Sequence, residues 1–349
     1  MPDVMIGIKV RRINAEKARK YLTKHTLLDN KHKVMSRNSF IYFPVRNMNN
    51  NTSTFLQDKL GGKIVRITFD TQNDMKSYKT LLKKALGDDY ENAPRGFESI
   101  GNIAIIDSNA KIAKKIGSVI MEMNKNISTV IRKEGAVKGR YRKRKYKHVI
   151  GKRRFVTEYK ENGATMKFDI RDTFFSTRLS FERSRIAALS KGKENVVVMF
   201  AGVGPFAIEL ALKNKEANVV GIEINRKAAR YMKENIELNK TKNVVAVSGD
   251  VKKVAKNYPD FADRIIMPLP KDAGSFLDSV VIMAKKKCIV HYYAFVDIDG
   301  GVEDLVEKLK AFFSSRKMRF EVIMWRTVRP YSPKTIEIVI DFKVARERY

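Results

Sequence analysis

Residues 195–206 read NVVVMFAGVGPF, and this stretch decides the fold. The apolar run 195–201 predicts a buried strand, and a helix is predicted directly after it over residues 205–213. Gly202 and Gly204 permit a tight turn between the two and a close approach of the backbone to a ligand. Because the third glycine and the lysine of phosphate-binding loops are both missing, the pattern speaks against a pyrophosphate cradle and against ATP.

Acidic residues stand at the end of the next predicted strand, residues 218–224, and just after the one that follows it, residues 243–248. Glu223 is placed to bind both hydroxyls of a ribose, and Asp250 to accept from the amino group of an adenine on which Val251 packs. Taken singly, each acid is more often a loop residue or a helix cap. Because the carboxyl ends of parallel strands meet at one edge, where open α/β sheets bind ligands, the three strand ends together predict a cofactor site.

Strands alternate with helices from about residue 171 onward. Further strands are predicted over residues 263–267 and 288–295, and helices over 226–239, 273–284 and 302–314. Continuous apolar strands separated by helices favour an α/β fold with a mostly parallel, Rossmann-like sheet covered on both faces. The last two strands, 319–328 and 335–344, are joined by a turn near residues 330–333 and predict an antiparallel edge strand.

Two smaller α+β domains are predicted before this sheet, which divides the chain into residues 1–72, 73–170 and 171–349. In the first domain, strands are expected over residues 4–10, 39–45 and 63–69 and a helix near 15–27. In the second, a strand is expected over 100–106 and a helix over 110–123.

The second domain ends in a basic tract, residues 131–160, which contains thirteen Lys or Arg and only two acids. Tyr141, Tyr146 and Phe155 stand among these charges. Basic side chains neutralise phosphates and aromatic rings stack on unpaired bases, so we interpret the tract as a nucleic-acid contact. The alternative is a solvated basic face whose aromatic rings turn into the core.

The charge of the whole chain points the same way. Seventy Lys and Arg stand against thirty-eight Asp and Glu, a formal net charge of +32 at pH 7. Such a surplus attracts polyanions, of which nucleic acid is the first candidate and an anionic membrane surface the second. A proteome with Lys-rich surfaces throughout is the alternative that needs no partner.

Several classes of protein are disfavoured. No run of eighteen apolar residues predicts a membrane span, and the N-terminus lacks the apolar core of a signal peptide, so we expect a cytoplasmic protein. Cys288 is the single cysteine, and the four histidines show no ligand spacing, so we expect neither a disulfide nor a metal site. His291 could serve as a base, but we interpret it as a polar residue at a strand end.

Eight short motifs, in order, carry a resemblance that covers essentially the whole chain. They are IYFPV at 41–45, FESIGNIA at 97–104, GRYR at 139–142, ENG at 161–163, FFSTR at 174–178, FER at 181–183, MFAGVGPF at 199–206 and HYY at 291–293. In these motifs the chain resembles the tRNA (guanine37-N1)-methyltransferases of archaea and eukaryotes. Several motifs in order are far more specific than any one alone.

This resemblance implies a class I methyltransferase fold that uses S-adenosylmethionine, with small N-terminal domains that bind tRNA. The implied substrate is the guanine on the 3′ side of the anticodon, flipped out of its loop. The implied cofactor-binding residues are Phe200, Ala201, Gly202, Val203, Gly204, Phe206, Glu223, Ile224, Asp250, Val251 and Pro268.

The resemblance also gives roles to residues near the guanine. Glu182 matches the acid proposed to take the N1 proton, and Arg142 an arginine proposed to steady O6 as charge develops. Arg178 and Phe174 fall in the segment that shapes the guanine pocket, and Pro268 is also expected to border the substrate. Chemistry agrees, because guanine N1 is a poor nucleophile until a carboxylate removes its proton. The alternative for Glu182 is a surface salt bridge with a neighbouring arginine, Arg183 or Arg185.

Two positions depart from the family pattern. Val198 stands where many relatives have an acid, and Pro268 stands where the family has an asparagine thought to contact guanine. Proline offers no side-chain amide, so base selection or reaction scope can differ. Some archaeal members of the family also methylate a wyosine precursor, which makes a second activity an open question.

Three functions therefore remain open at this point. The first is a tRNA guanine-N1 methyltransferase, which we expect to act as a monomer. The second is an enzyme of wyosine synthesis that moves the aminocarboxypropyl group of S-adenosylmethionine. The third is a tRNA-binding protein without activity. Val198 and Pro268 support this alternative, whereas the retained Arg142, Glu182, Glu223 and glycine loop are evidence against it.

Overall fold

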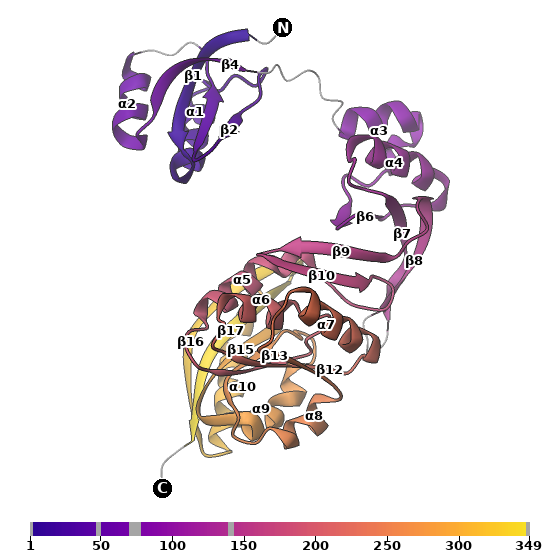
Figure 1. Ribbon diagram of the computed structural model, residues 1–349, viewed down its shortest axis with the longest axis vertical. Coiled ribbons are helices and arrows are strands. Elements are labelled where there is room, and N and C mark those ends of the chain that lie inside the picture. The colour runs from indigo at the N-terminus through magenta and orange to yellow at the C-terminus, as the bar shows by residue number, and fades with distance from the viewer. Residues whose placement is uncertain (1–2, 47–49, 70–77, 139–142, 347–349) are drawn as a thin grey trace. The chain divides into compact units, whose positions relative to one another are not determined.

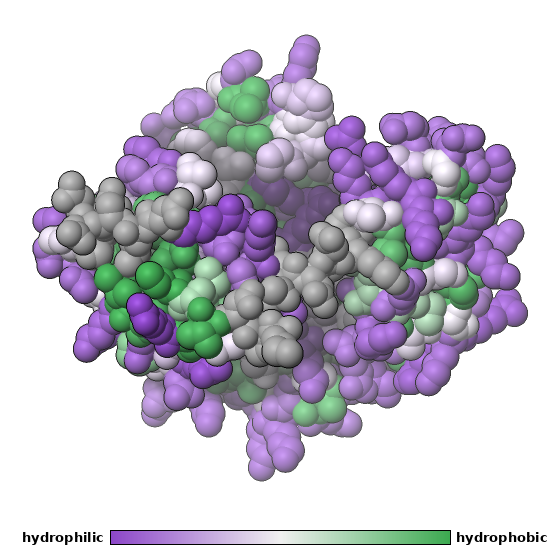
Figure 2. All heavy atoms as spheres, turned by 90° about the horizontal axis from the view of Figure 1, so that it is seen from above, coloured by the Kyte–Doolittle hydropathy of each residue, from purple (hydrophilic) through white to green (hydrophobic). Residues whose placement is uncertain are grey.

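The computed structural model describes residues 3–46, 50–69, 78–138 and 143–346. The chain forms two compact units, Met1–Leu81 and Leu82–Tyr349 (Figure 1). Among the described helices, none has the length and apolar character needed to cross a membrane. Hydrophilic side chains, purple in Figure 2, cover most of the face seen there, as expected for a chain with this charge.

The first unit is built on a four-stranded antiparallel sheet in the order β2-β3-β1-β4. Its elements are β1 Asp3–Arg11, α1 Ala15–Lys24, β2 Met35–Arg37, β3 Phe40–Pro44, α2 Asn50–Leu60 and β4 Lys63–Phe69. The three predicted strands are confirmed. The predicted helix ends earlier, at Lys24, because Thr26 adopts a positive φ of 56°. Helix α2 was not predicted, since its sequence is largely polar and lacks a regular apolar face.

A second four-stranded sheet follows, in the order β5-β6-β7-β8. The elements here are α3 Tyr78–Leu86, β5 Glu98–Ile100, β6 Ile103–Ile106, α4 Ala110–Met123, β7 Thr129–Lys138 and β8 Lys143–Gly151. One strand was expected over residues 100–106, but Gly101, with φ +57°, turns the chain there into a hairpin. A side chain at Gly101 would collide with the carbonyl oxygen of Glu158. Strands β7 and β8 form a hairpin that carries most of the basic tract.

The hairpin of β9 Val156–Glu161 and β10 Ala164–Asp169 joins this sheet to the remainder of the second unit. Met166 and Phe168 are completely buried, and they share one hydrophobic cluster with Ile103 of β6 and with Ile208 in the helix after the glycine loop. The hairpin therefore packs against both neighbours rather than linking them loosely.

The largest sheet has seven strands in the order β13-β12-β11-β14-β15-β17-β16. The strands are β11 Asn195–Met199, β12 Asn218–Glu223, β13 Val244–Ser248, β14 Ala262–Met267, β15 Ala284–Asp297, β16 Met318–Ser332 and β17 Thr335–Arg346. The α/β fold and mostly parallel sheet are as predicted. The antiparallel strand is β17, however, and it lies between β15 and the edge strand β16 instead of at the edge itself.

Helices cover both faces of this sheet (Figure 1). They are α5 Ser180–Leu189, α6 Pro205–Lys213, α7 Arg226–Leu238, α8 Val251–Val254, α9 Leu277–Met283 and α10 Gly301–Ser314. Short 3-10 helices cover Arg12–Asn14, Gly87–Asn92, Thr177–Leu179, Ala255–Asn257 and Ala273–Phe276.

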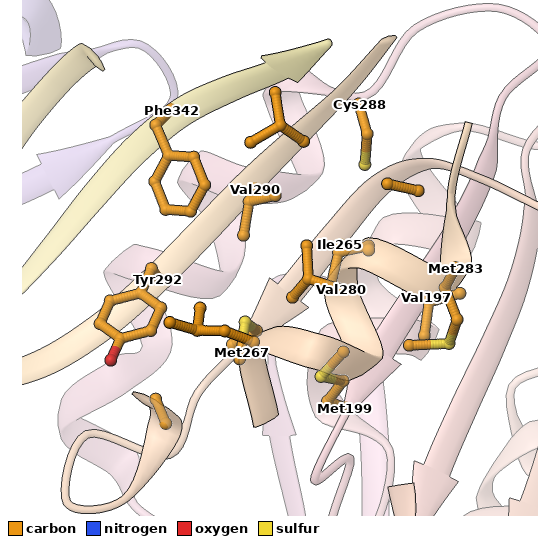
Figure 3. Close-up of a cluster of buried hydrophobic side chains, with 14 of the residues drawn as sticks. Val197, Met199, Ile265, Met267, Val280, Met283, Cys288, Val290, Tyr292 and Phe342 are labelled. Atoms are coloured by element: carbon orange, nitrogen blue, oxygen red, sulfur yellow. The ribbon is translucent and has the colours of Figure 1, made fainter. Parts of the chain in front are cut away.

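Alternate residues of the central strands enter two different cores, because successive side chains of a strand point to opposite faces. On one face Val197 and Met199 pack with Val280 of α9 (Figure 3). On the other, Val198 packs beneath α5 and α6 with Ile266 and is completely buried. An acid at this position would need a buried partner. The packing of the core therefore explains why valine stands at position 198, where the family pattern has an acid.

Candidate active site

The turn between β11 and α6 has the strained backbone that its sequence predicts. Gly202 has φ +61° and Gly204 φ +94°, and a Cβ on Gly204 would come within 2.8 Å of Met232. Phe200 also adopts a positive φ, 55°, which costs on the order of 1 kcal/mol for a side chain of this size. Its ring packs edge-on against Phe276, with 4.7 Å between the centroids. A turn held in this strained form is typical of a binding loop.

Glu223 is attached directly to this turn. Its Oε2 accepts from the Gly202 N–H at 2.8 Å, and its Oε1 accepts from the Asn225 N–H at 2.7 Å. Burial raises the pKa of Glu223, and the backbone hydrogen bonds oppose that rise. The structure thus brings together the two predicted parts of the cofactor site, the glycine loop and the acid at the end of the next strand.

The other predicted cofactor residues differ in what they present. Asp250 caps α8, since its side chain accepts from the Lys252 N–H at 3.0 Å, and Ile224 is half-buried after β12. Ala201, Val203, Phe206 and Val251 have their side chains buried, so backbone groups are the main contacts they can offer. Pro268 is half-buried after β14, where the Leu269 N–H donates to the Met267 carbonyl at 2.9 Å.

These groups fit a nucleoside better than a phosphate. The loop offers backbone N–H groups, a close approach at Gly202 and a carboxylate that suits neighbouring hydroxyls, and residues 199–206 contain no basic side chain. A Cβ on Gly202 would meet only the Phe174 carbonyl oxygen, at 3.7 Å. The arrangement therefore accommodates the adenosyl part of a cofactor at the carboxyl edge of the sheet.

Glu182 lies in the first turn of α5 with only 2% of its surface exposed. Its Oε2 accepts from the Tyr293 hydroxyl and from Arg185 Nε, both at 3.0 Å, and its Oε1 accepts from Arg326 Nη1 at 2.8 Å. The carboxylate is therefore not in a surface salt bridge, although Arg185 is one of its partners. Arg183 turns away and pairs with Glu161 and Glu209.

A chain of buried polar groups supports Glu182 from behind. Burial lowers the pKa of the Arg185 guanidinium, but Asp341 and Glu182 outweigh it and raise that pKa above its ordinary value. Asp341 Oδ1 also lies 2.7 Å from His291 Nδ1, while His291 Nε2 lies 2.8 Å from Arg264 Nη1. Arginine only donates, so Nε2 is the acceptor and Nδ1 carries the proton.

His291 is therefore held as a neutral ring, and burial lowers its pKa. The expectation that it lies at a strand end is wrong, because it is enclosed within β15 with 1% exposure. Both ring nitrogens already have protein partners, so its place in the structure is that of a buried link and not of a base.

The Glu182 carboxylate and the glycine loop lie at the same edge of the sheet. Tyr293, which contacts Glu182, follows Tyr292, the residue paired with the last residue of β14. The Tyr293 ring is 6.0 Å from that of Phe206, in the first turn after the loop. Two side-chain contacts thus connect Glu182 with the cofactor loop.

The remaining predicted residues fall on the segment before α5 or outside the described residues. Phe174 is 39% exposed, and its carbonyl oxygen faces Gly202. Arg178 is exposed in a 3-10 helix. Arg142 lies outside the described residues. Sequence reasoning placed none of Tyr293, Arg326 and Asp341 near Glu182, because residues so far apart along the chain leave no local pattern, although Tyr293 belongs to the motif HYY.

Three family models match successive parts of the chain. The tRNA methyltransferase 5 N-terminal domain matches residues 7–53, the TYW2 N-terminal domain residues 78–154, and the TRM5/TYW2 methyltransferase domain residues 157–323.

Known proteins and solved structures are similar over most of the length. The tRNA (guanine(37)-N(1))-methyltransferase Trm5b of Pyrococcus abyssi is 33% identical over 350 residues, with 97% of this chain and 99% of that protein covered. The complex structure of aTrm5 and tRNALeu has a TM-score of 0.66 at 29% identity, covering 97% of this chain and 99% of that one. The structure of Methanocaldococcus jannaschii TYW2 in complex with AdoMet has a TM-score of 0.58 at 28% identity, and it covers 72% of this chain and 100% of that one.

Proposed function

Since the chain belongs to the Trm5 family of tRNA (guanine(37)-N(1))-methyltransferases, we propose that it methylates N1 of guanine 37 in the anticodon loop of tRNA. The observation that supports this most directly is the buried carboxylate of Glu182 at the sheet edge that carries the glycine loop. The proposal includes a monomeric, cytoplasmic enzyme with three domains. Domains 1–72 and 73–170 would bind tRNA, and domain 171–349 would carry out the reaction.

The methyl donor of this proposal is S-adenosylmethionine, which supplies an electrophilic sulfonium methyl when bound. Glu223 would bind the ribose hydroxyls, and Asp250 the adenine amino group. The backbone of Phe200, Ala201, Gly202, Val203 and Gly204 would approach the cofactor, and Phe206, Ile224, Val251 and Pro268 would border it.

Glu182 is proposed as the base that takes the N1 proton. Tyr293 and Arg185 hold its Oε2, whereas Oε1 contacts Arg326, the most exposed of the three partners. Arg142 is proposed to steady guanine O6, and Phe174 and Arg178 to shape the pocket beside Gly202. Removal of the proton by a positioned carboxylate contributes about 10²–10⁴-fold to such reactions.

Aminocarboxypropyl transfer is the second candidate, because the chain also resembles TYW2. That structure covers only 72% of this chain, whereas Trm5b covers 97%. The first unit, part of which matches the methyltransferase 5 N-terminal model, therefore favours the methyltransferase.

One assay separates these functions. Unmodified tRNA transcripts are incubated with the protein and S-adenosylmethionine labelled in the methyl group, and the product is mapped by nuclease digestion and mass spectrometry. Methyl on N1 of guanine 37 supports the proposal, and a heavier adduct supports the second candidate. Methyl on a wyosine precursor would extend the scope, and tight binding without any adduct would indicate an inactive tRNA-binding protein.

Binding of tRNA should weaken steeply with salt, because Lys and Arg that neutralise phosphates release counterions. We expect the logarithm of the affinity to fall with a slope of about −0.7 to −0.9 per phosphate contacted. Filter binding at a series of salt concentrations measures this slope. A flat response would contradict the role given to the basic tract.

A further inference from the structure

The three groups that hydrogen-bond Glu182 differ in their access to solvent. Tyr293 is completely buried, and the Arg185 side chain is 14% exposed, whereas the Arg326 side chain is 33% exposed. Tyr293 and Arg185 both contact Oε2, and Arg326 contacts Oε1. A substrate group would therefore approach Oε1 from the side on which Arg326 lies.

Arg326 belongs to a rim of exposed groups around that side. It comes from the edge strand β16, and its guanidinium carbon lies 4.5 Å from the ring centroid of Phe181, the residue directly before Glu182. Phe181 is 63% exposed, and Met324, two residues before Arg326 on the same strand, is 37% exposed. An aromatic ring and a thioether at the surface beside a buried carboxylate offer apolar contacts to a planar base.

The pair of Arg326 and Glu182 also matches one edge of guanine. The N1–H of guanine is a donor, and O6, on the neighbouring ring carbon, is an acceptor. Oε1 is an acceptor and Arg326 Nη1 a donor, 2.8 Å apart. Without a base, these two protein groups satisfy each other, and an inserted guanine edge would give each of them a new partner.

We propose that Arg326 is a substrate-contacting residue that binds guanine O6 next to Oε1 of Glu182. N1 loses its proton to Oε1 and uses the freed electron pair to form a bond to the methyl carbon. The bond between that carbon and the sulfur breaks, and its electron pair stays on the sulfur. Negative charge that develops on O6 during this step is compensated by Arg326. The inference rests on the proposed function, and it adds to the role given to Arg142.

Substitution of Arg326 tests this role. Single-turnover methylation with saturating enzyme should slow by roughly 10²-fold in Arg326→Ala, the usual loss for one donor to a developing oxyanion. Arg326→Lys should recover part of the rate, because it restores a positive charge without the forked geometry. Arg319→Ala removes the same charge from an exposed position near the start of the same strand and should stay near wild type. Thermal unfolding of each variant checks that the fold is kept.

A substrate change separates contact with O6 from mere support of Glu182. The tRNA carries 6-thioguanosine at position 37, in which sulfur accepts hydrogen bonds more weakly than oxygen. For each enzyme, the rate with guanosine is divided by the rate with 6-thioguanosine. If Arg326 binds O6, this ratio should be at least about five-fold larger for wild type than for Arg326→Ala, a coupling of the size found for groups in contact. Equal effects in the two enzymes would overturn the inference.

The inference and the proposed function can fail separately. If wild type leaves guanine 37 unmethylated, the proposed function falls and the inference with it. If wild type methylates it and Arg326→Ala is as fast, only the inference falls.

Discussion

Two buried ion clusters flank helix α5, and they are built around arginines only two residues apart. Arg183, 2% exposed, faces two acidic side chains, Glu161 and Glu209, both also buried. Arg185 faces Asp341 and Glu182, and this second cluster reaches the surface through Arg326. The first cluster is closed, in the sense that all three of its side chains are buried. The second is open, because its partner Arg326 is partly exposed and can exchange Glu182 for a substrate group. Similar residue types thus yield a structural cluster on one side of the helix and a candidate site on the other.

The largest effect should come from the open cluster. Glu182→Gln keeps the shape of the side chain but removes the base, so we expect turnover to fall by about 10²–10⁴-fold. Affinity for tRNA should stay nearly intact, because phosphate contacts dominate it. Single-turnover kinetics and filter binding measure the two quantities. Equal loss of rate and affinity would count against Glu182 as the base.

The closed cluster should respond in stability instead. Arg183→Gln leaves Glu161 and Glu209 buried without their cation, and the Ser176 carbonyl loses a donor. Removing one partner of a buried ion pair destabilises by about 3–5 kcal/mol. Denaturant unfolding measures this loss. Arg230→Gln is the matched control, since its pair with Glu234 is exposed and such pairs contribute about 0–1 kcal/mol. Similar losses of stability in both variants would contradict the distinction between the buried cluster at Arg183 and an exposed ion pair.

A smaller effect should appear as a pH dependence. Burial, and then the neighbouring Glu161, raise the pKa of Glu209 to about 8. An acid whose pKa is raised by folding contributes its full stabilisation of the folded state at pH values below its pKa in the unfolded chain. This contribution is lost as the pH rises through its pKa in the folded protein. Stability should therefore fall between about pH 4.5 and pH 8.

Glu209→Gln should flatten this fall, because glutamine has no proton to lose. At pH 8 we expect the variant to be more stable than wild type, measured by denaturant unfolding at several pH values. Its methylation rate should stay near that of wild type. A variant with the same slope between pH 4.5 and pH 8 would show that Glu209 is already ionised in the folded protein.

The parts of the structure that could be predicted are those written locally in the sequence. Gly202 and Gly204 come shortly after the buried strand β11, and Glu223 is the last residue of β12, so the α/β fold and the cofactor edge were predictable. The surroundings of Glu182 were not, because Tyr293 and Arg326 lie 111 and 144 residues further along the chain. Periodicity also cannot show that Gly101 turns the chain between β5 and β6, since Glu158, whose carbonyl oxygen leaves room there only for glycine, lies 57 residues further along the chain.

The placement of β17 between β15 and β16 bears on when the protein can acquire activity. Asp341 lies on β17 and Arg326 on β16, and both come after every other described element in the order of synthesis. A nascent chain that has emerged as far as β15 already has the glycine loop, Glu223 and Glu182. It lacks the two strands that anchor Arg185 and cover the carboxylate, so the hydrogen-bond network around Glu182 is complete only after β16 and β17 have been synthesised.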